Sequence, residues 1–283
     1  MMRHLITILL FCLPGISQAA GGICEPEASF MTRQTREIMK PLQSDLIAKA
    51  KLGMKMYHHD DCSDVRKYTT TSYFGWQTTS NYGVCKDGST TFEQPDSTGL
   101  FEWNGFCGET ATSNVLNMTC GKKWHPNQEI HVLATDITPG TRPSALTSVL
   151  NELSPESNCK GKEWDYYDTA DSGKEYLNSI WNGLRSNSNF TRTRSDGTKI
   201  KRSPVMTLVK LDGSKTLHWI TIVDIVGYDS NKSLSENKGC YAYANQWDDQ
   251  YKIPCNDLAV MAKQTGDVYG GFAGKYVRIK QVD

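Results

Sequence analysis

The sequence WNGFCGETATSNVL, at residues 103–116, carries a cysteine from a short glycine-containing loop directly into a helix-compatible segment. This arrangement predicts that Cys107 lies at or next to the N-terminus of a helix. Backbone N–H groups without intrahelical partners and the helix dipole favour a thiolate at that position. Cys107 is therefore the candidate nucleophile, and the remaining chain is interpreted around it.

Two later residues would complete a site for thiol chemistry. His218 begins a run of apolar residues typical of a strand, and Asn245 closes a second such run. A cysteine nucleophile needs a neighbouring base, and that base needs a third group to orient it. The order cysteine, histidine, asparagine, with the first on a helix and the others on strands, indicates a cysteine hydrolase.

The cysteine count bears on this hypothesis, because eight cysteines follow residue 20. An even count permits four disulfides and no catalytic thiol, whereas a free Cys107 leaves three disulfides and a second unpaired thiol. Both alternatives stay open. Cys240 and Cys255 flank the segment that carries Asn245 and are expected to form a disulfide, with a pair between Cys120 and Cys159 among the competitors. The absence of a CxxC pair disfavours zinc ribbons and thioredoxin-like redox sites.

The N-terminus predicts export. Arg3 precedes an apolar segment at 5–13, and helix-breaking and small residues follow it, as is typical of a secretory signal peptide over residues 1–20. No later stretch approaches the roughly 20 apolar residues that a membrane span needs. We therefore expect a secreted or periplasmic protein.

The rest of the chain is long enough for one large domain or two lobes. We expect a helical and loop-rich segment over 21–99 and a catalytic domain over 100–283. A formal net charge of +0 argues against nucleic acid or an anionic membrane as a partner. The segment YHHDDC at 57–62 contains potential metal ligands, but adjacent side chains diverge. We expect a solvated turn there, and no metal or other cofactor.

Hydrophobic periodicity predicts an α+β fold with a mostly antiparallel sheet. Helices, in which apolar residues recur at three- and four-residue steps, are expected at 26–57, 107–120, 143–153, 172–186 and 256–264. From residue 203 the pattern changes to that of strands, which are expected at 204–211, 218–226, 240–247 and 276–280. The turn sequence DGSK between the first two strands predicts a hairpin.

Four motifs of this chain resemble those of the papain-like cysteine peptidase superfamily, and within it those of the C39-type and C39-like peptidases. They are CGETA at 107–111 followed by NVL at 114–116, SPVM at 203–206, HW at 218–219 leading to GYD at 227–229, and NQW at 245–247. The resemblance covers roughly residues 100–265. It implies a papain-like fold, in which the nucleophile lies on a central helix packed against the sheet.

The resemblance also implies a role for each candidate residue. Cys107 would attack a carbonyl carbon as a thiolate, and His218 would pair with it, protonate the leaving amine and activate water. Asn245 would orient the imidazole, as in papain, whereas C39 enzymes normally have aspartate there. Asp248 and Asp249 stand close by and are alternatives for this orienting role.

The oxyanion donor departs from the family pattern. These peptidases usually have a glutamine about six residues before the cysteine, and this chain has Phe101 there. Because an oxyanion hole needs a hydrogen-bond donor, Asn104 becomes the candidate, together with the backbone N–H of Cys107.

Three classes of function fit these patterns. The first is a peptidase acting on a peptide or protein substrate outside the cytoplasm. The second uses the same thioester chemistry, as a cell-wall peptide amidase or endopeptidase or as a transglutaminase-type acyl transferase. The third is a disulfide-stabilised binding module that retains the fold without activity.

Overall fold

The structure is a computed structural model. It describes residues 57–62, 66–71, 77–92, 107–121, 142–154, 159, 162–168, 173–186, 190–210, 217–246, 249–268 and 274–280. The expected signal peptide, all but the last residue of the expected helix at 26–57, and Asn104 lie outside this part of the chain.

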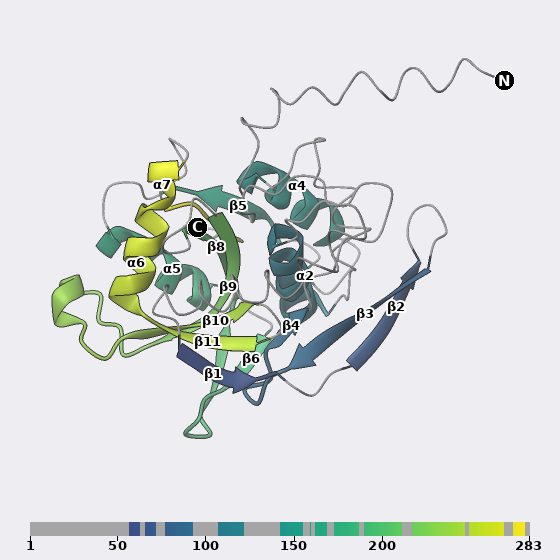
Figure 1. The fold of residues 1–283 in the computed structure, drawn as a ribbon, viewed down its shortest axis with the longest axis horizontal. Coiled ribbons are helices and arrows are strands. Elements are labelled where there is room, and N and C mark those ends of the chain that lie inside the picture. Colours follow the sequence, from purple (N-terminus) through teal and green to yellow (C-terminus); the bar gives the residue numbers. More distant parts are fainter. Residues whose placement is uncertain are drawn as a thin grey trace, which may run out of the picture.

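An antiparallel sheet forms the centre of the described chain (Figure 1). In spatial order it contains β1 (Tyr57–Asp61), β11 (Asp249–Pro254), β10 (Tyr241–Gln246), β9 (Leu217–Val226), β8 (Val205–Lys210), β12 (Tyr276–Ile279) and β5 (Trp164–Tyr167). Each neighbouring pair is antiparallel. The predicted α+β class with a mostly antiparallel sheet is confirmed.

Helices cover both faces of this sheet. One face carries α2 (Cys107–Cys120) and α4 (Pro143–Leu153), and the other carries α5 (Gly173–Arg185) and α6 (Cys255–Lys263), which α7 (Thr265–Val268) follows (Figure 1). Alternate residues of β9 serve the two layers: Trp219 packs with α2 and α4, whereas Ile220 and Ile222 pack with α5 and α6. A strand covered on both faces is buried along its length, as β9 is from Leu217 to Ile225, which explains why most of its residues are apolar.

The helices and strands expected from residue 143 onwards are all observed, and further strands that were not expected occur between them. The predicted hairpin forms between β8 and β9, which pair from Val205 with Ile222 to Lys210 with Leu217. The segment at 57–62 is a correction, because residues 57–61 form β1 and pair with β11 rather than making a turn. An edge strand is held by backbone hydrogen bonds, so its polar sequence gives no apolar signal. This pairing joins the segment expected as N-terminal to the sheet of the expected catalytic domain.

Two smaller sheets lie beside the central one. The first contains β2 (Arg66–Thr71), β3 (Gln77–Val84) and β4 (Thr90–Phe92), and the second is the hairpin of β6 (Phe190–Thr193) and β7 (Lys199–Arg202). The sequence patterns did not predict this hairpin. The backbone N–H of Phe92 donates to the side chain of Asn114 at 2.7 Å, which fixes β4 to α2.

Three disulfides join cysteine pairs within the described residues: Cys62–Cys85, Cys120–Cys159 and Cys240–Cys255. The last was predicted, and it closes the hairpin of β10 and β11 at the start of α6. The second fastens the end of α2 to the loop before β5. The first ties the end of β1 to the turn between β3 and β4. Helix η4 (Leu234–Glu236) lies in the loop between β9 and β10.

Candidate functional site

Cys107 is the first residue of α2, as the sequence predicted, and its side chain is buried. The backbone N–H of Trp219 on β9 donates to its sulfur, with an N-to-Sγ distance of 3.2 Å. A second contact joins the same elements, because the Thr221 hydroxyl donates to the Ala111 carbonyl at 3.4 Å. The start of α2 is therefore held directly against the first half of β9.

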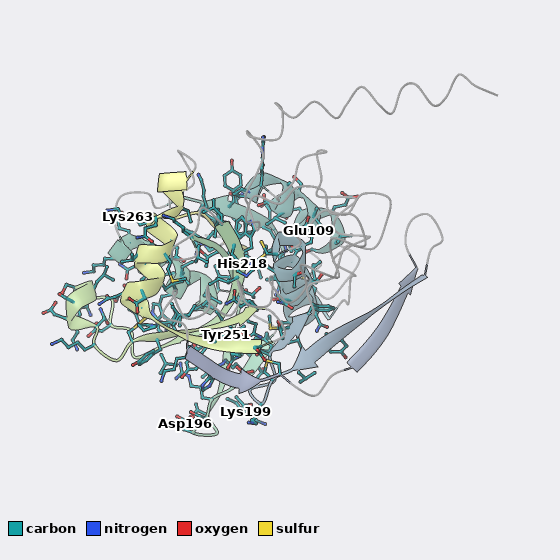
Figure 2. The ribbon with its side chains drawn as sticks, viewed as in Figure 1. Glu109, Asp196, Lys199, His218, Tyr251 and Lys263 are labelled. Atoms are coloured by element: carbon teal, nitrogen blue, oxygen red, sulfur yellow. A yellow bond between two sulfur atoms is a disulfide. The ribbon has the colours of Figure 1, made fainter. Side chains whose placement is uncertain are left out.

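A small pocket lies where this helix meets the sheet. It brings together the three residues predicted to be catalytic, and Figure 2 shows His218 in the interior of the molecule beside α2. Side chains from α2, β9 and β10 contribute to its wall. The lining residues are Cys107, Thr110, Ala111, Asn114, His218, Trp219, Asn245 and Gln246.

The environment of His218 favours a neutral imidazole. Burial lowers the pKa of His218 from 6.5 to about 3, and a side-chain hydrogen bond with Gln246 opposes this shift. Desolvation dominates because taking an imidazolium out of water is costly unless a negative charge lies nearby. In this state His218 can accept a proton, as a general base must.

The sulfur of Cys107 is part of a disulfide. Every other cysteine of the described residues pairs within one of the three disulfides above. In this structure Cys107 is therefore not a free thiol. A disulfide sulfur carries no negative charge, so it does not offset the effect of burial on the pKa of His218 as a thiolate would.

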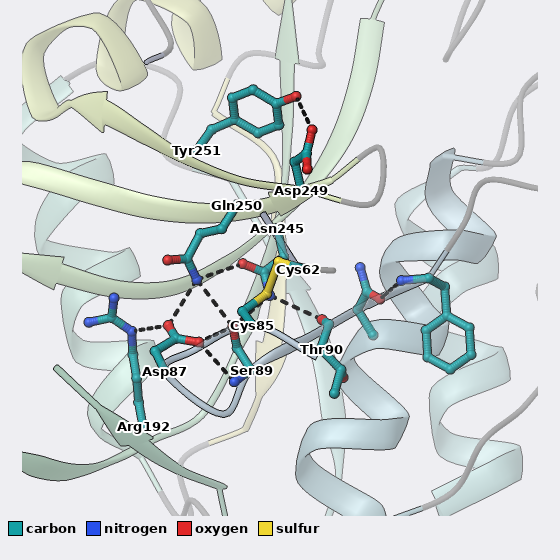
Figure 3. The surroundings of a disulfide bond; sticks show 12 residues. Cys62, Cys85, Asp87, Ser89, Thr90, Arg192, Asn245, Asp249, Gln250 and Tyr251 are labelled. Carbon is teal, nitrogen blue, oxygen red and sulfur yellow. Dashed lines mark hydrogen bonds and ion pairs between the residues drawn. A yellow bond between two sulfur atoms is a disulfide. The ribbon is translucent and has the colours of Figure 1, made fainter. Parts of the chain in front are cut away.

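Asn245 lines the pocket, but its amide bonds to another part of the molecule (Figure 3). Its Nδ2 donates to the Ser89 hydroxyl at 2.9 Å and to the Thr90 carbonyl at 3.0 Å. Its Oδ1 accepts from Nε2 of Gln250 at 3.0 Å. Asn245 thus fastens the turn between β3 and β4 to the sheet, and Gln246, which the sequence did not single out, lines the pocket beside it.

A buried group of charges continues from this amide network. The Asp87 carboxylate accepts from Gln250 at 2.8 Å and from Nε of Arg192 at 2.6 Å (Figure 3). Burial raises the pKa of Asp87, but Arg192 and the hydrogen bonds of Ser89 and Gln250 outweigh it, so the pKa is lowered from 3.8. The carboxyl group is therefore ionised at neutral pH.

Arg192 connects Asp87 to a second buried carboxylate. Its Nη1 donates to Asp224 at 2.8 Å, and Asp224 is fully buried. Arg194 and Arg202 also bond to Asp224, at 3.0 and 2.7 Å. Arg192 lies over the Tyr243 ring, 4.4 Å from its centroid. These contacts hold the β6–β7 hairpin on the sheet, and they give Asp224 a structural role.

Two other candidates lie outside the described residues: Asn104 and Asp248. Asp249 accepts a hydrogen bond from the Tyr251 hydroxyl at 3.2 Å on β11. Within the described ranges, no cluster of three or more histidine, cysteine, aspartate or glutamate residues has the arrangement of a metal site. In the same ranges, no helix has the length and apolar character needed to cross a membrane.

Comparison with known proteins adds no relative. No protein-family model, no curated protein and no solved structure matches this chain. The function is therefore argued from the geometry and chemistry of the pocket.

Proposed function

We propose that this protein is an exported cysteine hydrolase that cleaves peptide bonds, with Cys107 as the nucleophile and His218 as the base. One arrangement carries the proposal: the first residue of α2 and a histidine of β9 line the same buried pocket. In addition, β9 donates a backbone N–H to the cysteine sulfur at 3.2 Å. A helix N-terminus and a hydrogen-bond donor both stabilise a thiolate relative to a thiol.

The proposed enzyme is latent while Cys107 remains in its disulfide. A dithiol reductant would attack this bond and become a cyclic disulfide, transferring two electrons and two protons. The products on the protein are two thiols, one of which is Cys107. The nucleophile therefore becomes available only after reduction.

Proton transfer then depends on the pKa of the base. A neutral His218 takes the thiol proton, and the new negative charge on sulfur raises the pKa of the imidazolium that forms. The thiolate attacks the carbonyl carbon, the imidazolium protonates the leaving amine, and a thioester remains on Cys107. His218 next deprotonates a water that hydrolyses the thioester. Such acid–base steps contribute roughly 10²- to 10⁴-fold in rate.

The competing functions differ in the fate of the thioester. A cell-wall amidase or endopeptidase would use the same steps on peptidoglycan bridges, and a transglutaminase-type enzyme would transfer the acyl group to an amine instead of water. A non-enzymatic binding module is favoured by one observation, the disulfide at Cys107. In that case reduction would produce a thiol without turnover.

The experiment is mass mapping of alkylated cysteines on the native mature protein over a series of dithiol concentrations, with parallel assays on casein and peptidoglycan. We expect hydrolysis to begin at the concentration at which Cys107 first becomes alkylated. The matched control is Cys107→Ser under identical reduction, which retains the three disulfides of the described residues. Complete alkylation of Cys107 without turnover of either substrate would contradict the hydrolase and favour the binding module.

A further inference from the structure

The first turn of α2 carries a second polar side chain close to Cys107. Thr110 lines the same pocket and is 4% exposed. Its hydroxyl has no hydrogen-bond partner among the described residues. A buried hydroxyl without a partner is costly and uncommon in native proteins, and it is explained by a catalytic function or by a bound water.

We propose that the Thr110 hydroxyl is an oxyanion donor, which gives a hydrogen bond to the carbonyl oxygen of a substrate while Cys107 attacks the adjacent carbon. The inference rests on the proposed function of Cys107 as the nucleophile. It supplies a donor that the sequence motif lacks, because Phe101 stands where a glutamine was expected. Side-chain hydroxyl groups are among the donors that stabilise a developing oxyanion.

Helix geometry places Thr110 on the correct side of α2. The four residues of this helix that line the pocket are three or four positions apart, so they share one face of the helix. They are Cys107, Thr110, Ala111 and Asn114. Helical side chains lean toward the N-terminus of their helix, so the Thr110 side chain leans toward Cys107. The positive end of the helix dipole lies there too, and it favours negative charge on an oxygen.

Other hydroxyl groups of α2 are used within the helix. Thr112 donates to the Gly108 carbonyl at 2.9 Å, and Ser113 donates to the Glu109 carbonyl at 3.1 Å. Bonding to the carbonyl four residues earlier is a common way for a helical hydroxyl to be satisfied. Thr110 makes no such bond within the described chain, so its O–H can donate to an oxygen in the pocket.

The size of the pocket favours a single oxygen atom as its occupant. Its cavity volume is about 10 Å³. A cavity of roughly 10–15 Å³ holds one water, so this space admits a carbonyl oxygen but not a side chain. The neighbouring amide of Asn245 is not a competing donor, because its two N–H groups donate to Ser89 and Thr90.

The test separates stabilisation of the oxyanion from the reactivity of the thiol. The full mature protein is reduced with a dithiol until Cys107 can be alkylated, and the reductant is then removed. The Cys107 thiolate attacks p-nitrophenyl acetate: the S–C bond forms, the carbonyl electron pair moves to oxygen, and the intermediate expels p-nitrophenolate to leave an acetyl thioester. Iodoacetamide alkylates the same sulfur by displacement of iodide, and no negative charge develops on a carbonyl oxygen.

Thr110→Val retains the shape of the side chain and removes the hydroxyl. It is expected to slow acylation of Cys107 by at least about tenfold, toward the roughly 10²- to 10³-fold that loss of one oxyanion donor costs. Alkylation by iodoacetamide, which reports the thiolate, should stay within about twofold of the parent. Thr110→Ser retains a hydroxyl and should restore most of the acylation rate. Cys107→Ser gives the background of both reactions.

The matched control is Thr119→Val on the same helix. Thr119 is also buried, and its hydroxyl also has no partner among the described residues, but it does not line the pocket. This variant should leave both rates unchanged. Equal acylation rates in Thr110→Val and the parent would overturn the inference and would mean that the hydroxyl holds a structural water only. If Thr110→Val does not fold, the acylation rates of Thr110→Ala and Thr110→Ser decide in the same way.

The same experiment distinguishes this inference from the hydrolase proposal, because acylation by p-nitrophenyl acetate needs neither a peptide nor turnover. Selective loss of acylation in Thr110→Val, in a protein that cleaves neither casein nor peptidoglycan, would uphold the oxyanion donor and reject peptide hydrolysis. Peptide hydrolysis by the parent, together with unchanged acylation in Thr110→Val, would uphold the enzyme and reject the donor. Equal slowing of alkylation and acylation would assign the effect to the thiol and overturn the inference.

Discussion

His218 and Asp87 are both buried titratable residues, but at neutral pH His218 is uncharged whereas Asp87 is ionised. Burial lowers the pKa of His218 to about 3, so it is uncharged at neutral pH. Asp87 is also buried, but Arg192 and three polar hydrogen bonds lower its pKa and keep it ionised. The difference shows that burial alone does not decide charge; the neighbours do. A compensated charge fixes structure, whereas an uncompensated base can still change its protonation state during a reaction.

The largest effect is expected in the pocket that contains Cys107 and His218. Cys107→Ala should reduce hydrolysis by several orders of magnitude after reduction, since the members of such a site act as a unit. The fold should persist, because the other described disulfides remain. Steady-state assays on casein and peptidoglycan, with circular dichroism as the folding control, provide the measurement. Activity within about tenfold of the parent would remove the nucleophile from Cys107.

The next largest effect is expected in the buried charge cluster that contains Asp87 and Asp224. Asp224→Ala leaves Arg192, Arg194 and Arg202 without their shared carboxylate. Removing one partner of a buried ion pair typically costs about 3–5 kcal/mol in the free energy of unfolding. Urea unfolding measures it. The control is Lys199→Ala, at an exposed position of the same hairpin, which should change stability by less than about 0.5 kcal/mol. Equal losses in both variants would contradict a structural role for the charge cluster.

A variant without the Cys240–Cys255 disulfide tests stability away from both the His218 pocket and the Asp87 charge cluster. Replacing both cysteines by alanine should cost roughly 3 kcal/mol, the value expected from loop-closure entropy for a loop of this length. Urea unfolding of the oxidised double variant gives the number. The titration of Asp87 should not change, since the disulfide closes the far end of the β10–β11 hairpin. A loss below about 1 kcal/mol would mean that the hairpin and α6 hold this end without the covalent link.

The smallest effect is a pH dependence that belongs to His218 alone. Between its folded pKa of about 3 and its unfolded value of 6.5, the unfolded chain binds more protons. The free energy of unfolding therefore falls as pH falls through this window, by at most about 1.4 kcal/mol per pH unit. Asp87 contributes at lower pH. Because its pKa is lowered in the folded protein, its stabilisation is present above pH 3.8 and is lost as the pH falls below that value.

Urea unfolding at pH 4.5 and 6 separates these contributions. His218→Gln should flatten the slope between the two pH values, and the control His59→Gln, at an exposed position of β1, should not. An unchanged slope in His218→Gln would mean that the histidine is already charged in the folded protein.

The sequence predicted the parts of this fold that depend on local patterns. The β8–β9 hairpin follows from two apolar runs around a turn, and α4 follows from its periodicity and its N-terminal proline. The edge strand β1 and its neighbour β11 were missed because backbone pairing leaves no mark in side-chain composition. The link between Asp87 and Arg192 was missed because in sequence a buried charge looks the same as an exposed one.

The candidate site was predictable to the same extent. The start of α2 at Cys107 and the pocket position of His218 follow from the motifs. The hydrogen bonds of Asn245 to Ser89, Thr90 and Gln250 do not, because they depend on how β10 is placed against β9 and the turn between β3 and β4. The register between β9 and β10 shifts at a bulge between Tyr243 and Ala244. A bulge reverses which of two adjacent side chains faces a given side, so the faces of Asn245 and Gln246 could not be assigned from the sequence.

The pairing of β1 with β11 has a consequence for where this protein can be cut. A shortened chain beginning at residue 100 would retain every candidate catalytic residue but would lose β1, and with it the cover on the edge of β11. An uncovered strand edge offers its N–H and C=O groups to another molecule, so such a fragment should self-associate. It would also lose Ser89 and Thr90, which fix Asn245. A fragment that keeps this edge covered therefore begins at or before residue 57, well upstream of the motifs that suggest the chemistry.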